Sequence, residues 1–139
     1  MYRFRIHYIT IIIFLISLSC NRHDEIVKDI YNRWEITDFM SVESVLYEKD
    51  NDFDPVIEFY RNGSYSIQLD VNNCLGGFSL PGNEGIKITV AGCTKMCCDS
   101  DFSKKIIEML PQVDSYSIEK NKMKLNVPGW GWINLELDN

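Results

Sequence analysis

Val-Ile-Glu-Phe-Tyr-Arg-Asn-Gly-Ser-Tyr-Ser-Ile-Gln-Leu, residues 56–69, is the segment from which the class of fold follows. Its two apolar arms flank Asn62-Gly63, a pair that tolerates the positive φ angles of a tight hairpin turn. In the second arm Tyr65, Ile67 and Leu69 alternate with polar residues, so one face is expected to be buried and the other wet. The segment therefore predicts an antiparallel β-hairpin.

Short strand patterns separated by turns continue on both sides of this hairpin. Gly76-Gly77 and Pro81-Gly82-Asn83 bracket one of them, and Pro128-Gly129-Trp130-Gly131 turns the chain into the last. The expected strands are Tyr31–Met40, a weaker Val42–Tyr47, Val56–Tyr60, Ser64–Leu69, Phe78–Leu80, Ile86–Val90, Ser115–Glu119, Lys122–Val127 and Trp132–Leu137.

One segment changes to a helical period. Its apolar residues recur at helical spacing from Phe102 to Leu110, with charged residues on the other face. We expect an α-helix over about residues 100–110, capped by Asp99 or Ser100 and ending before Pro111. Mostly antiparallel strands with one late helix predict an α+β fold, a β roll or open barrel with that helix packed against it.

The first 19 residues have the pattern of an export signal peptide. Arg3 and Arg5 precede an apolar run over residues 9–16, and small serines lie just before Cys20. A cysteine at this place resembles the lipobox of bacterial lipoproteins, in which acyl chains such as palmitate are attached to the new N-terminus. Ser17 departs from the aliphatic residue usual three positions before the cysteine. An ordinary signal peptide or a short membrane anchor are the alternatives.

These features predict three parts of the chain: signal peptide 1–19, lipidated Cys20 with a tether to residue 30, and one domain over 31–139. The expected location is the bacterial cell envelope, with the lipid anchored in the outer membrane on its periplasmic or surface face. The formal net charge is −6. Since an acidic domain repels phosphate backbones, we expect no nucleic-acid partner, and membrane contact only through the lipid.

The four cysteines after Cys20 predict two disulfides, because an even number in an exported chain is typical of structural bonds. A bond between the neighbours Cys97 and Cys98 is expected to be strained. We therefore favour Cys74–Cys98 with Cys93–Cys97, although the exchanged pairing stays open. A zinc site is the competing interpretation, but the spacing lacks paired knuckles.

No constellation of catalytic residues is evident, and we expect neither enzyme activity, cofactor nor metal. His23 is the only histidine after the leader and lies in the tether, where it is poorly placed to assist a nucleophile. The acidic run over residues 50–54 resembles the start of a calcium loop but lacks the later ligands. The basic series Lys120, Lys122 and Lys124 is expected to mark a wet face or a protected sheet edge.

A resemblance to a known family rests on several short motifs. They are Trp34, Asn62-Gly63-Ser64-Tyr65, Asn73-Cys74, Thr94-Lys95-Met96-Cys97-Cys98, and a helix followed by Val113 and Tyr116. Together they resemble the META/HslJ-like domain of bacterial envelope lipoproteins. Leu75, where that family often has asparagine, is a departure. The resemblance implies a compact β-rich fold with one helix and no catalytic mechanism, and links to heat or envelope stress.

We therefore expect a non-enzymatic envelope lipoprotein domain that acts as a binding or stress-protective module, its ligand or protein partner unknown. Trp130, in a turn between glycines, is the candidate ligand-binding residue. One alternative is a lipocalin-like carrier with a small apolar ligand between sheet and helix. A second is an envelope thiol oxidoreductase, which needs a reactive thiol.

Overall fold

The computed structural model describes residues 29–43, 46–49 and 52–138. Within these ranges the chain forms an antiparallel sheet and one helix, α2 (Asp101–Met109), which continues as a short 3₁₀ turn over Leu110–Gln112. The strands are β1 (Arg33–Ser41), β2 (Leu46–Glu48), β3 (Val56–Phe59), β4 (Ser64–Gln68), β5 (Asn73–Ser79), β6 (Lys87–Cys93), β7 (Ser115–Glu119), β8 (Lys122–Val127) and β9 (Gly131–Leu137).

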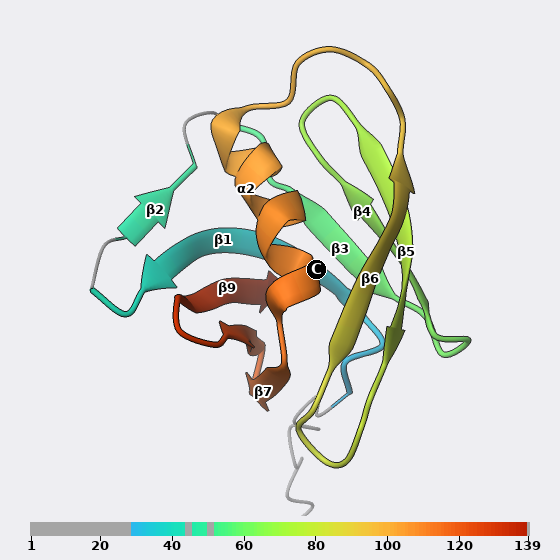
Figure 1. The fold of residues 1–139 in the computed structure, drawn as a ribbon, viewed down its shortest axis with the longest axis vertical. Coiled ribbons are helices and arrows are strands. Elements are labelled where there is room, and N and C mark those ends of the chain that lie inside the picture. The colour runs from blue at the N-terminus through green and yellow to red at the C-terminus, as the bar shows by residue number, and fades with distance from the viewer. Residues whose placement is uncertain (1–28, 44–45, 50–51, 139) are drawn as a thin grey trace, which may run out of the picture.

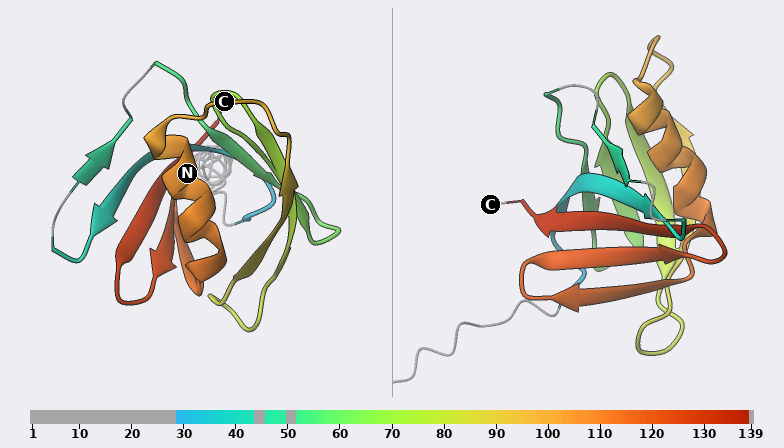
Figure 2. Two further views of the ribbon diagram at one scale, coloured as in Figure 1. Left: turned by 45° about the horizontal axis from the view of Figure 1, so that its top comes forward. Right: turned by 90° about the vertical axis from the view of Figure 1, so that its left-hand side faces the viewer.

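The strands follow the order β6-β5-β4-β3-β1-β9-β8-β7, and β2 branches from β1. The sheet curls so strongly that its two ends approach each other (Figures 1 and 2). The Tyr116 backbone N–H, on β7, donates to the Glu84 carbonyl at 2.9 Å, and the Ile86 N–H donates to the Asp114 carbonyl at 2.9 Å. The predicted open barrel of antiparallel strands is confirmed.

Helix α2 lies across the open side of the curl (Figure 2). Ser100 caps it by accepting a hydrogen bond from the Ser103 N–H at 3.2 Å, as the sequence predicts. The ring of Phe102 stacks on that of Phe39 in β1, with centroids 4.6 Å apart. Ile106, a residue of the helix itself, is fully buried. The space between sheet and helix is therefore occupied by packed side chains.

The chain enters the sheet through a buried first turn. Ile30 is only 2% exposed, and the indole N–H of Trp34 donates to the Ile30 carbonyl at 3.0 Å. The guanidinium of Arg61 binds the Asp29 carboxylate at 2.5 Å and lies 4.7 Å from the centre of the Tyr31 ring. The residues at the start of the described chain are thus held to the hairpin between β3 and β4.

Strand β5 begins earlier than expected. The glycine pair Gly76-Gly77, interpreted from sequence as a boundary, lies inside the strand. Gly76 pairs with Tyr65, and a Cβ atom added at Gly76 would overlap both the Tyr65 ring and the Thr89 carbonyl oxygen. The glycine is there because the tyrosine ring needs the space, and the prediction of a short strand over Phe78–Leu80 was wrong at its start.

The disulfides also differ from the favoured pairing. The structure joins Cys74 to Cys93 and Cys97 to Cys98, so the prediction of Cys74–Cys98 with Cys93–Cys97 is wrong. The reason is strand register: Cys74 in β5 stands directly opposite Cys93 in β6. Because β6 extends beyond Val90, where the sequence pattern had ended it, this opposition was not visible from spacing alone.

The segment before β5 is held to the loop before α2 by a network of hydrogen bonds. The disulfide expected from sequence would have joined the same two segments. Asn72 is 5% exposed. Its side-chain oxygen accepts from the Met96 N–H at 2.8 Å, and its amide donates to Asp99 Oδ2 at 2.7 Å. Asp99 Oδ1 accepts from the N–H groups of Val71 and Asn72. The network fixes the approach to the helix.

Replacing Gly76 with alanine should destabilise the fold, because the new methyl group would meet the Tyr65 ring and a β6 carbonyl. We expect Gly76→Ala to lower the free energy of unfolding by about 1–3 kcal/mol, the usual cost of overpacking. Gly92→Ala is the control, since a Cβ at Gly92 meets nothing within 4 Å. Urea denaturation measures both, and equal stabilities would contradict the packing described.

The disulfide connectivity predicts unequal effects of removing each bond. The Cys74–Cys93 bond spans 19 residues, so the double variant Cys74→Ala/Cys93→Ala should lose about 3 kcal/mol of stability. Cys97→Ala/Cys98→Ala should lose less, because a bond between neighbours restricts the unfolded chain far less. Urea denaturation under oxidising conditions compares the two variants with the parent.

Peptide mapping tests the same connectivity directly. Trypsin cuts after Lys95, so the cysteines fall on peptides 62–87, 88–95 and 96–104. The observed bonds leave the first two joined and the third separate, with its own internal bond. A mass in which all three peptides are joined would contradict the observed bonds and would fit either of the two pairings considered from sequence.

Candidate functional site

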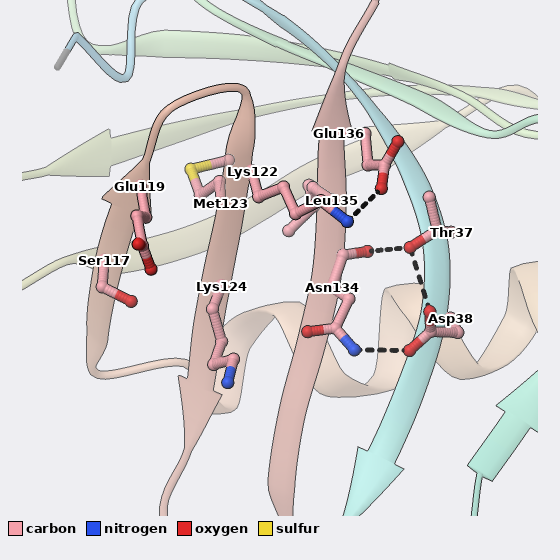
Figure 3. A pocket seen from close by; sticks show the side chains of 10 residues that line it. All are labelled: Thr37, Asp38, Ser117, Glu119, Lys122, Met123, Lys124, Asn134, Leu135 and Glu136. Atoms are coloured by element: carbon pink, nitrogen blue, oxygen red, sulfur yellow. Dashed lines mark hydrogen bonds and ion pairs between the residues drawn. The ribbon is translucent and has the colours of Figure 1, made fainter. Parts of the chain in front are cut away.

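A polar groove lies on the face of the sheet that is turned away from α2 (Figure 3). Its volume is about 370 Å³, and strands β1, β9, β8 and β7 form its floor. We call it the polar groove. It is lined by Thr37, Asp38, Ser117, Glu119, Lys122, Met123, Lys124, Asn134, Leu135 and Glu136.

Strand register places the polar side chains in one row. Ser117 of β7 pairs with Lys124 of β8, Lys124 pairs with Asn134 of β9, and Asn134 pairs with Asp38 of β1. Because side chains alternate between the two faces of a strand, the neighbours of these residues in β8 and β9 point into the core. The polar row therefore lies on the outer face of the same strands whose inner face forms the packed core.

A β-bulge in β1 adds a second polar side chain to the row. The register with β9 shifts between Ile36 and Asp38. Ile36 and Phe39 are both 0% exposed, so the two residues between them are both left on the outer side. Figure 3 shows Thr37 and Asp38 together beside Asn134. Bulges commonly re-aim a side chain in this way.

Hydrogen bonds hold the Asp38 carboxylate in place. Asn134 Nδ2 donates to Asp38 Oδ1 at 2.5 Å, and Thr37 Oγ1 donates to Asp38 Oδ2 at 3.1 Å. The same hydroxyl also lies 3.2 Å from the backbone carbonyl of Asn134. The carboxylate is therefore oriented by both strands that form this side of the groove.

Two lysines supply the positive charge of the groove. Lys122 forms an ion pair with Glu136 at 2.8 Å, and this hydrogen bond raises the pKa of the lysine. Lys124 Nζ lies 4.7 Å from the centre of the Trp132 ring, a cation–π contact. Strand β8 lies between β7 and β9, so these lysines occupy a central strand. Of the two alternatives expected from sequence, a wet face or a protected edge, the structure shows the wet face.

Trp130, the ligand-binding candidate from sequence, lies outside the polar groove. It is half-buried, its ring 6.3 Å from that of Phe39 and 5.8 Å from that of Tyr47. Lys105 Nζ of the helix lies 5.6 Å from the centre of the Trp130 ring. The structure therefore places this tryptophan in an aromatic cluster at the end of β1, and its role in binding stays a prediction.

Several other predicted features lie elsewhere or outside the described residues. Cys20 and His23 lie outside the described residues. In the acidic run, residues 50 and 51 are also outside, while the Asp54 carboxylate binds the Lys49 ammonium, which lowers the pKa of Asp54. Within the described ranges, no three acidic, histidine or cysteine side chains are grouped to hold a metal ion.

The chemistry available in the polar groove is that of hydrogen bonding. None of the ten lining residues is a histidine or a cysteine, and Ser117 has no base in hydrogen-bond contact among the described residues. Carboxylate, amide, hydroxyl and ammonium groups face the same space (Figure 3). This arrangement suits the recognition of a ligand that both donates and accepts hydrogen bonds.

Sequence reasoning missed the groove because its residues lie on four strands, of which β1 is far in the chain from β7, β8 and β9. One signal was present in β1. The apolar alternation of Trp34 and Ile36 predicts a buried residue at position 38, yet Asp38 is polar and Phe39 is the buried one. Such a break in the period of two is typical of a bulge.

Comparison with known proteins agrees with this architecture. The chain resembles a DUF4847 family protein from Bacteroides vulgatus ATCC 8482, with a TM-score of 0.60 and 16% identity. The alignment covers 78% of this chain and 94% of that chain, and it shows a shared fold. No curated protein matches the chain. Among the described residues, no helix is long and apolar enough to cross a membrane.

The family assignment comes from a family model. The model described as the META domain matches residues 28–130. This range takes in the sheet from β1 to β8 and helix α2, and therefore contains Asp38 and Lys124 of the polar groove. The match confirms the resemblance drawn from the sequence motifs. This chain belongs to the META domain family.

Proposed function

We propose that this META domain is a non-enzymatic, lipid-anchored module of the bacterial cell envelope that binds a ligand in the polar groove. The observation that carries the proposal is the row of Ser117, Lys124, Asn134 and Asp38 across four strands. Polar groups that share one space and are held in register form a preorganised surface for binding. A role in protecting the envelope under stress would act through that binding.

The anchor in this proposal is Cys20, which follows a leader of signal-peptide pattern. Acyl chains at this residue would hold the domain at the outer membrane through the tether that ends near Asp29. An acidic domain gains little from anionic head groups, so the lipid would supply the membrane affinity.

Binding is favoured over the other functions considered. A carrier of an apolar ligand needs space between sheet and helix, where Phe39, Phe102 and Ile106 are packed together. A thiol oxidoreductase of the thioredoxin type needs a C-x-x-C pair, and neither Cys74–Cys93 nor Cys97–Cys98 has that spacing. The groove, by contrast, needs no rearrangement to accept a ligand.

Lipid attachment predicts that growth with labelled palmitate labels the wild-type chain and leaves Cys20→Ala unlabelled, because only the thiol of Cys20 starts the modification. Mass spectrometry of the N-terminal peptide should show an acylated cysteine at position 20 as the first residue. An unmodified Cys20 in the mature chain would contradict the anchor.

Binding in the groove predicts localised changes in an NMR spectrum. The ¹⁵N-labelled chain from residue 20, with Cys20→Ala, is titrated with detergent-solubilised envelope extract, and detergent alone is the blank. We expect amide shifts at the outer row of β1, β8 and β9. Asn134→Ala should lose them, because Asp38 then loses the donor that orients it.

The matched control is Gln68→Ala, a polar-to-alanine change on the exposed side of β4, outside the groove. It should bind as the parent does. Both variants should stay folded, since one hydrogen bond at a part-exposed site is worth about 1 kcal/mol. Shifts that are absent, or that survive Asn134→Ala unchanged, would overturn the proposed function.

A further inference from the structure

The chemical class of the ligand follows from the hydrogen-bonding capacity that the groove leaves unused. Each oxygen of the Asp38 carboxylate accepts one described hydrogen bond, from Asn134 or from Thr37. A carboxylate oxygen can accept two, so each keeps capacity toward the groove. The Asn134 amide uses one of its two N–H groups on Asp38. Acceptors and a donor therefore lie side by side at the β1–β9 end.

Donors continue along the same row. Lys124, on β8, is the register partner of Asn134 on β9. Among the described residues Lys124 forms no ion pair with a carboxylate. Its ammonium rests over the Trp132 ring at 4.7 Å, a contact that leaves N–H groups available for hydrogen bonding. The Ser117 hydroxyl ends the row on β7. Figure 3 shows these side chains projecting from the sheet into the groove.

The dimensions of the row fit an extended ligand. It crosses three gaps between neighbouring strands at about 4.8 Å each, and is thus about 14 Å long. Both donors and acceptors occur along it, from the Ser117 hydroxyl and the Lys124 ammonium to the Asn134 amide and the Asp38 carboxylate. A ligand that fills the row must present paired donors and acceptors at several points along its length.

The charges in the groove argue against a charged ligand. Lys122 and Glu136 form an ion pair, so these two residues add no net charge to the groove. Lys124 faces two carboxylates, Asp38 and Glu119, so both signs of charge line the groove and its formal charge is −1. An anion would meet these carboxylates on a chain of net charge −6, and a cation would meet the Lys124 ammonium. An apolar ligand would leave the row desolvated without partners.

From this combination we infer that the polar groove binds a neutral, hydroxyl-rich ligand, namely an oligosaccharide or the glycan part of an envelope polymer. A hydroxyl donates and accepts at once, so adjacent hydroxyls can bind the Asp38 carboxylate and the Asn134 amide together. Trp132 borders the groove on the same side of β9 as Asn134, and its indole would respond to a bound sugar through Lys124, whose ammonium lies over the ring. This inference rests on the proposed function and names the ligand class for it.

The test uses defined neutral sugars as probes. The ¹⁵N-labelled chain from residue 20, with Cys20→Ala, is titrated with maltotriose, cellotriose and tri-N-acetylchitotriose. We expect at least one to produce saturable shifts at millimolar concentration, centred on the Asn134 side-chain amide and the Trp132 indole. Asn134→Ala should weaken this binding by about tenfold, the loss expected for one or two hydrogen bonds. Gln68→Ala should bind equally well.

A second arm covers glycans that the three sugars do not represent. Envelope extract is treated with periodate, which cleaves the bond between adjacent hydroxyl-bearing carbons, and is then quenched and dialysed. Loss of the groove shifts after this treatment supports the inference, as does saturable binding of any trisaccharide. If no trisaccharide binds and the shifts survive periodate, the ligand is not a saccharide, although the proposed function stands. If untreated extract and sugars both leave the spectrum unchanged, both fail.

Discussion

The pairing of β1 on both of its edges is the constraint on which the rest of the structure depends. Its first half bonds to β3 and β9 together, and beyond the bulge it bonds to β9 and β2. The two arms of the sheet, β3-β4-β5-β6 and β9-β8-β7, therefore join at this strand. The same nine residues supply Ile36 and Phe39 to the core and Asp38 to the groove. Because a slip of one residue exchanges the faces of a strand, interior packing and outer chemistry are specified by a single register.

Much of the fold could be predicted from local pattern, because hairpin turns and helical periods are local properties. The Asn62-Gly63 hairpin and the Ser100-capped helix lie where the sequence places them. What local pattern could not show was anything set by partners distant in the chain. Gly76 looks like a turn residue until the Tyr65 ring is seen against it. Cys93 looks like a loop residue until β6 is seen to extend beside β5.

The candidate site was harder to predict for the same reason, since it is a row across strands rather than a motif along one. Lys124 and Asn134 are ten positions apart and meet only through the β8–β9 register. Without that register, alternating lysines indicate nothing more than a wet face. The cysteines led to a wrong prediction. They were expected to join the segment before β5 to the loop before the helix, but hydrogen bonds between Asn72 and Asp99 make that connection. Hydrogen bonds of buried amides leave little trace in composition or spacing.

The buried turn at Ile30 has a mechanical consequence. A force applied through the chain preceding Asp29 enters the domain at Ile30, which the Trp34 indole holds, and passes into β1. Interstrand hydrogen bonds run across the strands, so a pull along β1 loads those to β3 and β9 in parallel, in shear, rather than opening them one after another. Asp38 lies on this strand. The line of tension between a tether and a molecule held in the groove would thus run along one well-bonded strand, leaving the helix and β4 to β6 free of load.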